Sequence, residues 1–164
     1  MKNKLTLKFA CIIALTIFTI SAKAQTKDFS GKWKRNDSRS IVSEGVSPNT
    51  IPQALEIKQT AKQLIITRTL KNAGVTSYQE TLNLDGSKSI SHPAATMTKE
   101  TTLTRSPDKS SFTTMNTYYN SSGEADHTFK ETWKLENEGS TLHISATWAQ
   151  GAATHQLEEY FAKQ

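Results

Sequence analysis

Cysteine is nearly absent from this 164-residue sequence, and the single one, Cys11, lies near its start. Beyond it the chain has no thiol, which excludes a disulfide framework, a thiolate nucleophile and cysteine metal ligands there. The sequence also lacks the run of about 20 apolar residues that a membrane-spanning helix needs. Its longest apolar run, FACIIALTIFTI, is about a dozen residues long. Any stability of the folded part must therefore come from its own core.

That apolar run belongs to a pattern typical of a secretory signal peptide. Three lysines precede it, and the sequence SAKA at 21–24 follows it, with small residues that match an A-x-A cleavage site. We expect cleavage after Ala24, which leaves residues 25–164 as one domain, secreted or periplasmic. A retained membrane anchor is the alternative, but we expect no stable membrane insertion. Cys11 lies inside the run, which is the wrong place for a lipid-modified cysteine.

The sequence after residue 24 also carries little net charge. The sequence has 20 basic and 15 acidic residues, but four of the lysines and none of the acids lie in that segment. The 16 basic and 15 acidic residues that remain nearly cancel. They do not form the Lys and Arg clusters of a nucleic-acid or anionic-membrane surface. We therefore expect no nucleic-acid partner.

Helical periodicity is hard to find, whereas alternation with period two recurs along the chain. Runs rich in Thr, Ile, Tyr, Phe and Trp predict strands, and turn signals such as KNAG at 71–74 and DG at 85–86 predict hairpins. The fold prediction is all-β, an antiparallel up-and-down barrel of eight to ten strands, because closing a meander removes its exposed edges. The predicted strands are 29–35, 53–60, 63–71, 74–84, 87–92, 97–105, 111–120, 126–136, 140–149 and 154–163.

One polar link interrupts this pattern, between the first two strands. Its sequence, NDSRSIVSEGVSPNTIP at 36–52, allows either a short helix at Ser38–Ser43 or a plain loop. Elsewhere the connections are short, and neither a repeat nor a second domain is needed.

The alternation assigns charged residues to the interior together with apolar ones. Arg68, Glu131 and Glu159 fall on the same strand faces as large apolar residues, Trp133 and Trp148 among them. Burying charges without partners is costly, so these side chains either pair with each other or face water in a cavity. A cavity would be a binding site. The alternative is that the inner and outer faces of those strands are reversed.

The start of the first strand resembles a known signature. Gly31 and Trp33, in the stretch FSGKW, resemble the Gly-x-Trp motif of lipocalins and fatty-acid-binding proteins, the calycin superfamily. In that superfamily the tryptophan closes one end of the barrel, and the glycine lets backbone approach closely. LEIKQTAKQLIITRTL and TLHISATWAQGAATHQLEEYF are similar to the second and final hairpins of fatty-acid-binding proteins. The chain is also similar to small secreted bacterial lipocalin-like proteins of unknown function.

The departures from that superfamily bear on the ligand. Fatty-acid-binding proteins hold a carboxylate with an Arg-x-Tyr pair, and matching their tyrosine to Tyr160 puts Glu158 at the arginine position. The interior would then carry net negative charge, so we expect neutral or cationic amphiphiles to bind better than free fatty acids. The link at 36–52 lies where those proteins have a helical lid but is short for two helices. The last strand offers no arginine to stack on Trp33, as lipocalins often have.

Catalytic and metal-binding patterns are missing. The sequence has no G-x-S-x-G, phosphate loop or dinucleotide fingerprint, and no two histidines have the i, i+2 spacing of a strand-borne metal pair. His127 and Glu131 share a strand face and could form an acid–base pair, but solvated residues or a structural ion pair are the simpler interpretation. We expect the protein not to be an enzyme, with no catalytic residue, no metal and no cofactor.

Three function classes remain, in this order. The first is an exported protein that holds a partly apolar small molecule in the barrel cavity, as a monomer. The second is an envelope structural or protein-interaction module with a filled barrel, and the third is a small-barrel enzyme. For the first class, the structural signature is Gly31 with Trp33, and the predicted ligand-binding residues are Arg68, Glu131, Trp133, Trp148 and Tyr160.

Overall fold

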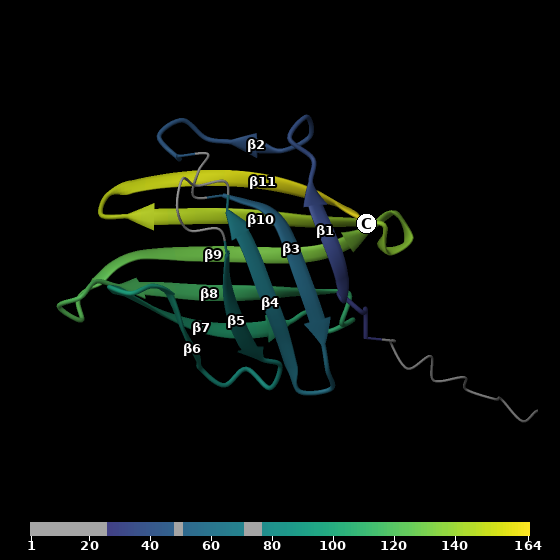
Figure 1. Cartoon of the computed structure of the whole chain (residues 1–164), viewed down its shortest axis with the longest axis horizontal. Coiled ribbons are helices and arrows are strands. Elements are labelled where there is room, and N and C mark those ends of the chain that lie inside the picture. The colour runs from purple at the N-terminus through teal and green to yellow at the C-terminus, as the bar shows by residue number, and fades with distance from the viewer. Residues whose placement is uncertain (1–25, 48–50, 71–76) are drawn as a thin grey trace, which may run out of the picture.

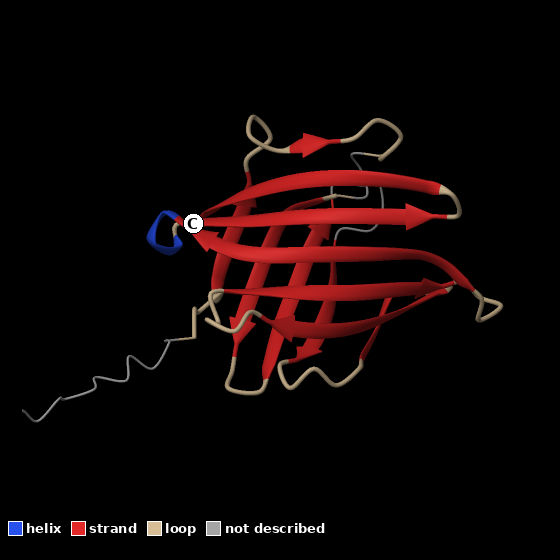
Figure 2. Cartoon of the chain, turned by 180° about the vertical axis from the view of Figure 1, so that it is seen from behind, coloured by secondary structure: helices blue, strands red, loops and turns tan. Residues whose placement is uncertain are grey.

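The computed structural model describes residues 26–47, 51–70 and 77–164. Apart from one short helical turn, η2 (Asn137–Gly139), all of its regular structure is strand (Figure 2). No helix in these described ranges is long and apolar enough to cross a membrane. The predicted signal peptide at 1–24 and the predicted turn at 71–74 lie outside the described residues. The strands are β1 (Gly31–Arg35), β2 (Ile41–Val42), β3 (Pro52–Gln59), β4 (Gln63–Leu70), β5 (Ser77–Asn83), β6 (Ser89–Ala94), β7 (Met97–Arg105), β8 (Ser111–Tyr119), β9 (Ala125–Glu136), β10 (Thr141–Gln150) and β11 (Ala153–Lys163).

Ten of these strands form one antiparallel sheet that curls into a nearly closed barrel. The order is β5-β4-β3-β1-β11-β10-β9-β8-β7-β6, with β2 paired to β11 beside it. In Figure 1, β1, β3, β4 and β5 cross the flatter-lying β7 to β11 at a steep angle. The two end strands, β5 and β6, meet at a turn where the Asn83 N–H donates to Ser89 Oγ at 2.9 Å. The prediction of an antiparallel barrel of eight to ten strands is confirmed.

The two faces of each strand follow the alternation in the sequence. In β10, Leu142, Ile144 and Ala146 are buried, whereas His143 and Ser145 between them are only half-buried. Because side chains alternate across a strand, a slip of one residue would turn the whole apolar set outward. The same rule buries the charged side chains assigned to the interior.

The link at 36–52 contains neither the helix at Ser38–Ser43 nor a plain loop. A turn at 36–40, closed by backbone hydrogen bonds of 3.1 and 3.2 Å, leads into β2. β2 then pairs with β11 at Leu157 and Glu158. Thus β1 and β2 are successive partners of one edge of β11, with the turn between them.

Trp33 lies at the centre of the apolar end of the barrel and is 1% exposed. Its indole N–H donates to the Phe29 carbonyl at 3.1 Å. Gly31 has a φ of 145°, a backbone conformation that residues with a side chain rarely adopt, so a glycine is favoured there. The Lys163 ammonium lies 5.2 Å from the centre of the Trp33 ring, a cation–π contact. The predicted burial of Trp33 is confirmed, and its cationic partner is a lysine of the last strand, not an arginine.

The barrel is filled in three layers. The cluster around Trp33 occupies one end, a smaller apolar cluster occupies the other, and charged side chains lie between them. We call the second end the mouth, where β8 and β10 end and β9 and β11 begin. Its apolar cluster, the mouth cluster, consists of Val42, Val46, Ile51, Phe129, Ala146, Trp148 and Leu157.

Candidate ligand-binding site

Arg68 of β4 lies in the middle of the barrel, and all three of its guanidinium nitrogens are bonded. Nε donates to Glu80 of β5 at 2.6 Å, and Nη1 and Nη2 donate to the two carboxylate oxygens of Glu131 of β9 at 3.0 Å each. The Lys99 ammonium of β7 donates to the other oxygen of Glu80 at 2.6 Å. Side chains from four strands thus form one ion cluster, which we call the central ion cluster (Arg68, Glu80, Lys99 and Glu131).

The two carboxylates of this cluster are ionised at neutral pH. Burial alone would raise the pKa of Glu80, but Lys99 and Arg68 outweigh it and lower that pKa to about 2. Burial would likewise raise the pKa of Glu131, and the same two cations lower it. Burial would lower the pKa of Arg68, but its two glutamates raise it. The charges are therefore retained because each lies against its counter-ion.

Three predicted ligand-binding residues meet at this cluster. Arg68 is 4% exposed, Glu131 2% and Trp133 0%. The Trp133 indole N–H lies 3.4 Å from Glu131 Oε2, which also accepts a hydrogen bond from Thr114 at 3.1 Å. The assignment of these side chains to the interior is therefore correct, and of the two alternatives left open for Arg68 and Glu131 the structure has the pairing with each other. Their polar atoms are bonded to one another, and ligand contact by these three residues stays a prediction.

Tyr160, also predicted to contact ligand, lies apart from them on the outer face of β11. Its ring stacks on His143 with ring centres 4.3 Å apart. Glu158, on the same face, is 2.6 Å from His143 Nε2 and accepts a hydrogen bond from Ser145 at 2.8 Å. Strand parity explains this placement, because Glu159 between them is buried and faces inward. The match of Glu158 and Tyr160 to an interior head-group pair is therefore wrong.

The interior charge comes from other residues than the sequence indicated. The sequence-based count included Glu158, which lies outside, and left out Glu80 and Lys99, which are buried. The buried charged residues of the described chain are two basic and three acidic ones, namely Arg68, Lys99, Glu80, Glu131 and Glu159.

Glu159 is the unusual member of that set. Its Oε1 is buried without a hydrogen-bond partner in the described part of the chain. Burial and the nearby Glu131 raise the pKa of Glu159 to about 7, against the opposing effects of Arg68 and Arg35. The interior charge is therefore −1 when Glu159 is ionised and zero when it is protonated.

Four rings line the mouth in a row, one from each of the strands β8 to β11. The ring centres of Tyr118 and His127 lie 4.3 Å apart, those of His127 and Trp148 5.8 Å, and those of Trp148 and His155 5.1 Å. All four are half-buried and share strand parity with buried residues, so they face inward. We call them the ring row. Of these four, Trp148 alone was predicted from the sequence to contact ligand, although the same alternation also marks the other three.

The polar atoms of the ring row are unequally satisfied. Trp148 Nε1 is buried and finds no hydrogen-bond partner among the described residues. His155 Nδ1 lies 3.1 Å from the Glu44 carbonyl oxygen, which can only accept, so Nδ1 carries the hydrogen and Nε2 is the acceptor. Burial raises the pKa of Tyr118, so its phenol is neutral.

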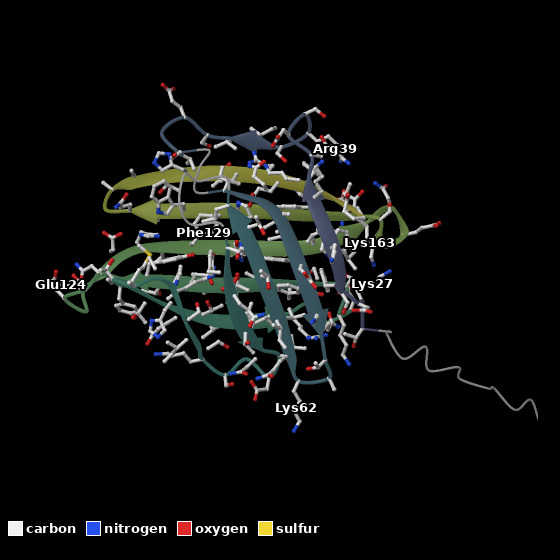
Figure 3. The ribbon with its side chains drawn as sticks, viewed as in Figure 1. Lys27, Arg39, Lys62, Glu124, Phe129 and Lys163 are labelled. Carbon is white, nitrogen blue, oxygen red and sulfur yellow. The ribbon has the colours of Figure 1, made fainter. Side chains whose placement is uncertain are left out.

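The link between β1 and β3 covers part of the ring row. Val46 and Ile51 from this link pack into the mouth cluster with Trp148 and with Phe129, which is labelled in Figure 3. At Gly45, with a φ of 87°, a Cβ would lie 3.1 Å from the His155 ring. The aliphatic cover of the ring row, Val46 and Ile51, therefore comes from a segment that is distant in sequence from β8 to β11.

The His127 and Glu131 side chains, considered above as an acid–base pair, have separate partners. His127 Nδ1 lies 2.7 Å from Asp126 Oδ2, and Glu131 is held by Arg68. Four residues along a strand span about 13 Å, which separates the two groups. Nowhere in the described chain do three His, Cys, Asp or Glu side chains gather so as to hold a metal ion.

A hollow of about 630 Å³ lies away from the ring row, beside β6, β7 and the turn after β8. At one side of it Glu100 accepts hydrogen bonds from Tyr119, at 3.1 Å, and lies 2.8 Å from the Lys88 ammonium. The residues around it are mostly exposed, and its charged groups, Lys88 and Glu100, are paired with each other. The ring row is therefore the better candidate site.

Comparisons with known proteins bear on the fold alone. No protein-family model matches the chain, and no curated protein sequence matches it. Among solved structures, the chain is similar to zebrafish ileal bile acid-binding protein complexed with cholic acid, with a TM-score of 0.53 and 16% sequence identity. The match covers 83% of this chain and 98% of that protein. The predicted likeness to the fatty-acid-binding-protein fold is confirmed, whereas the closer likeness to secreted bacterial lipocalin-like proteins stays a prediction.

Proposed function

We propose that this protein binds a small, largely apolar and uncharged molecule at the mouth of its barrel, as a monomer outside the cytoplasm. The observation that carries the proposal is the ring row, four half-buried rings that face inward under an aliphatic cover. Ligand sites are typically concave and mostly apolar, with a few placed polar groups. The mouth has this composition, because one indole N–H lies unpaired among apolar and aromatic side chains.

The shared fold supports a ligand of this general size. The zebrafish protein of similar fold forms a complex with cholic acid. The layered interior of this chain argues for a site nearer the mouth, since the central ion cluster and the apolar end are nearly inaccessible.

The charge of the ligand follows from the pairing inside the barrel. Arg68 and Lys99 already hold Glu80 and Glu131, so a ligand carboxylate would have to compete with two buried glutamates. The interior charge, −1 when Glu159 is ionised and zero when it is protonated, gives a cation little advantage over a neutral molecule. We therefore expect uncharged ligands to bind best and anionic chains worst.

Export rests on residues 1–24 alone. The basic start, the short apolar run and the small residues at Ala22 and Ala24 support a secreted or periplasmic protein. Mass measurement of the exported protein should give Gln25 as its first residue. Recovery of the exported protein with residues 1–24 intact would reject this part of the proposal.

The binding proposal is tested by native mass spectrometry of the purified protein and by displacement of a fluorescent apolar probe. Trp148→Ala should weaken probe binding about tenfold or more, because it removes one of the two inner rings of the row. Thr147→Ala is the matched control, since Thr147 is its neighbour on the opposite face of β10 and should bind as the parent does. Equal binding by the parent and Trp148→Ala would contradict the proposal, provided that both proteins unfold at similar temperatures.

A second candidate is a protein-interaction module with a filled barrel. The observation that favours it is the low accessibility of the central ion cluster, where Glu80 and Glu131 are each 2% exposed. Failure of anionic, neutral and cationic probes alike, with no co-purifying molecule, would favour this candidate over ligand binding.

A further inference from the structure

The rings of the mouth differ in how they are turned. Tyr118 and His127 are nearly parallel, at 16°, whereas His127 meets Trp148 nearly edge-on, at 76°. Trp148 and His155 are tilted by 33°. Rings attract other rings in offset-stacked or edge-to-face arrangements at separations of about 4.5–7 Å. A row of rings one strand apart therefore offers a flat molecule several such contacts at once.

The indole N–H of Trp148 is the unmatched polar group of this surface. The other two indoles are bonded, Trp33 to a carbonyl at 3.1 Å and Trp133 to a carboxylate at 3.4 Å. Trp148 Nε1 is buried and lacks a partner within the described chain. An unpaired buried donor is costly, and a ligand that supplies an acceptor removes that cost. A saturated hydrocarbon chain would cover the ring and leave the N–H unpaired.

Charge near the mouth argues against an ionic ligand group. The phenols of Tyr78 and Tyr118 stay neutral, because burial raises the pKa of each. The Lys99 ammonium, 5.6 Å from the centre of the Tyr118 ring, is already bound to Glu80. Asp126, the carboxylate nearest in sequence to the row, is paired with His127. An acceptor without charge fits these surroundings best.

Resting on the proposed function, we infer that the ligand is an uncharged, planar, conjugated molecule that carries a hydrogen-bond acceptor. Its ring system packs along the ring row, and its acceptor, such as a ketone oxygen, takes the hydrogen bond of Trp148 Nε1. Planarity matters for a second reason, because a rigid molecule has few rotatable bonds to immobilise on binding. The inference separates this protein from a general carrier of flexible chains.

Three neutral probes of similar size test the two features separately. 2-Acetylnaphthalene is planar and has an acceptor, 2-ethylnaphthalene is planar without one, and 2-acetyldecalin has the acceptor without the planar rings. Affinities are measured by calorimetry and by quenching of tryptophan fluorescence. We expect 2-acetylnaphthalene to bind at least about fivefold more tightly than either of the others, as one hydrogen bond or one ring contact provides.

The variant that tests the hydrogen bond is Trp148→Phe, which keeps one aromatic ring and removes the N–H donor together with the second ring of the indole. Because 2-acetylnaphthalene and 2-ethylnaphthalene lose the same ring contact, both should bind more weakly, and the advantage of 2-acetylnaphthalene should fall to about onefold. Thermal unfolding of the variant confirms that it is folded, and Thr147→Ala again serves as the control.

The outcomes separate this inference from the proposed function. Equal binding of the three probes, or an advantage of the ketone that persists in Trp148→Phe, overturns the inference and leaves a less selective binding protein. Tighter binding of a charged naphthalene, whether a carboxylate or an amine, overturns it as well. Failure of every probe to bind overturns both.

Discussion

Both carboxylate oxygens of Glu131 accept hydrogen bonds from the guanidinium of Arg68, at 3.0 Å each, although the two residues belong to β4 and β9. This contact crosses the barrel from one layer of strands to the other. Through Glu80 the same guanidinium also reaches Lys99 on β7. The contacts therefore join β4 and β5, at one end of the sheet, to β7 and β9, which lie toward the other end.

Removing Arg68 should be strongly destabilising. In Arg68→Met, two buried glutamates keep only Lys99 as a counter-ion, and breaking a buried ion pair in this way costs about 3–5 kcal/mol. Denaturant unfolding at pH 7 measures the loss. Lys130→Met, an exposed change next to Glu131 on β9, should alter the free energy of unfolding by less than about 0.5 kcal/mol. Adding Glu131→Gln to Arg68→Met should restore part of the loss, because it removes one of the stranded charges.

Trp33→Ala should destabilise the protein by about 3–5 kcal/mol, the usual loss for a buried aromatic side chain. Lys163→Met keeps the stem over the ring and removes only the ammonium, so it should cost no more than about 1 kcal/mol. The comparison of the two unfolding curves separates packing from the cation–π contact. A Trp33→Ala protein as stable as the parent would be incompatible with the role assigned to this ring.

Glu159 should make stability fall as pH rises toward neutral. Its pKa is raised from the ordinary 4.5 to about 7 in the folded protein, so the folded state holds this proton more tightly than the unfolded chain does. The resulting stabilisation is complete below pH 4.5 and is lost as the pH rises through 7, a difference of about 3 kcal/mol. Glu80, with a pKa lowered to about 2, acts in the opposite direction and only below about pH 4.5.

The measurement is the free energy of unfolding between pH 5 and pH 8.5 for the parent and for Glu159→Gln. The parent should lose stability across this range relative to the variant, and the variant should be the more stable protein at the upper end. Glu56→Gln, at an exposed position of β3, is the control and should follow the parent. Parallel curves for the parent and Glu159→Gln would show that this carboxyl does not titrate in the range.

The strands and their inner faces could be read from the sequence because period two is a local property. The alternation placed Arg68, Glu131 and Glu159 inside the barrel. It also predicted the ends of β9 to β11 to within one or two residues of the observed ends. Tyr160 shows the limit of matching by resemblance. A position can correspond to a family's binding residue in order along the chain and still point outward.

The partners of the buried charges could not be read in the same way. Glu80 and Lys99 lie 19 residues apart in sequence, and they meet only because the sheet curls and brings β5 close to β7. Period two shows which face a side chain takes but not which side chain lies opposite. Lys163 could not be recognised by resemblance, because the lipocalin residue that stacks on this tryptophan is an arginine, whereas the ring needs only a cation.

The pairing of β1 with β11, where Trp33 lies opposite Lys163, also orders events in time. The first strand of the barrel has no neighbour on that edge until the last one exists. When the chain emerges from its amino end, nearly all of the other strands are therefore present before β1 and β11 can pair and close the barrel. During that interval the edges that β1 and β11 later share stay open to pairing with another chain.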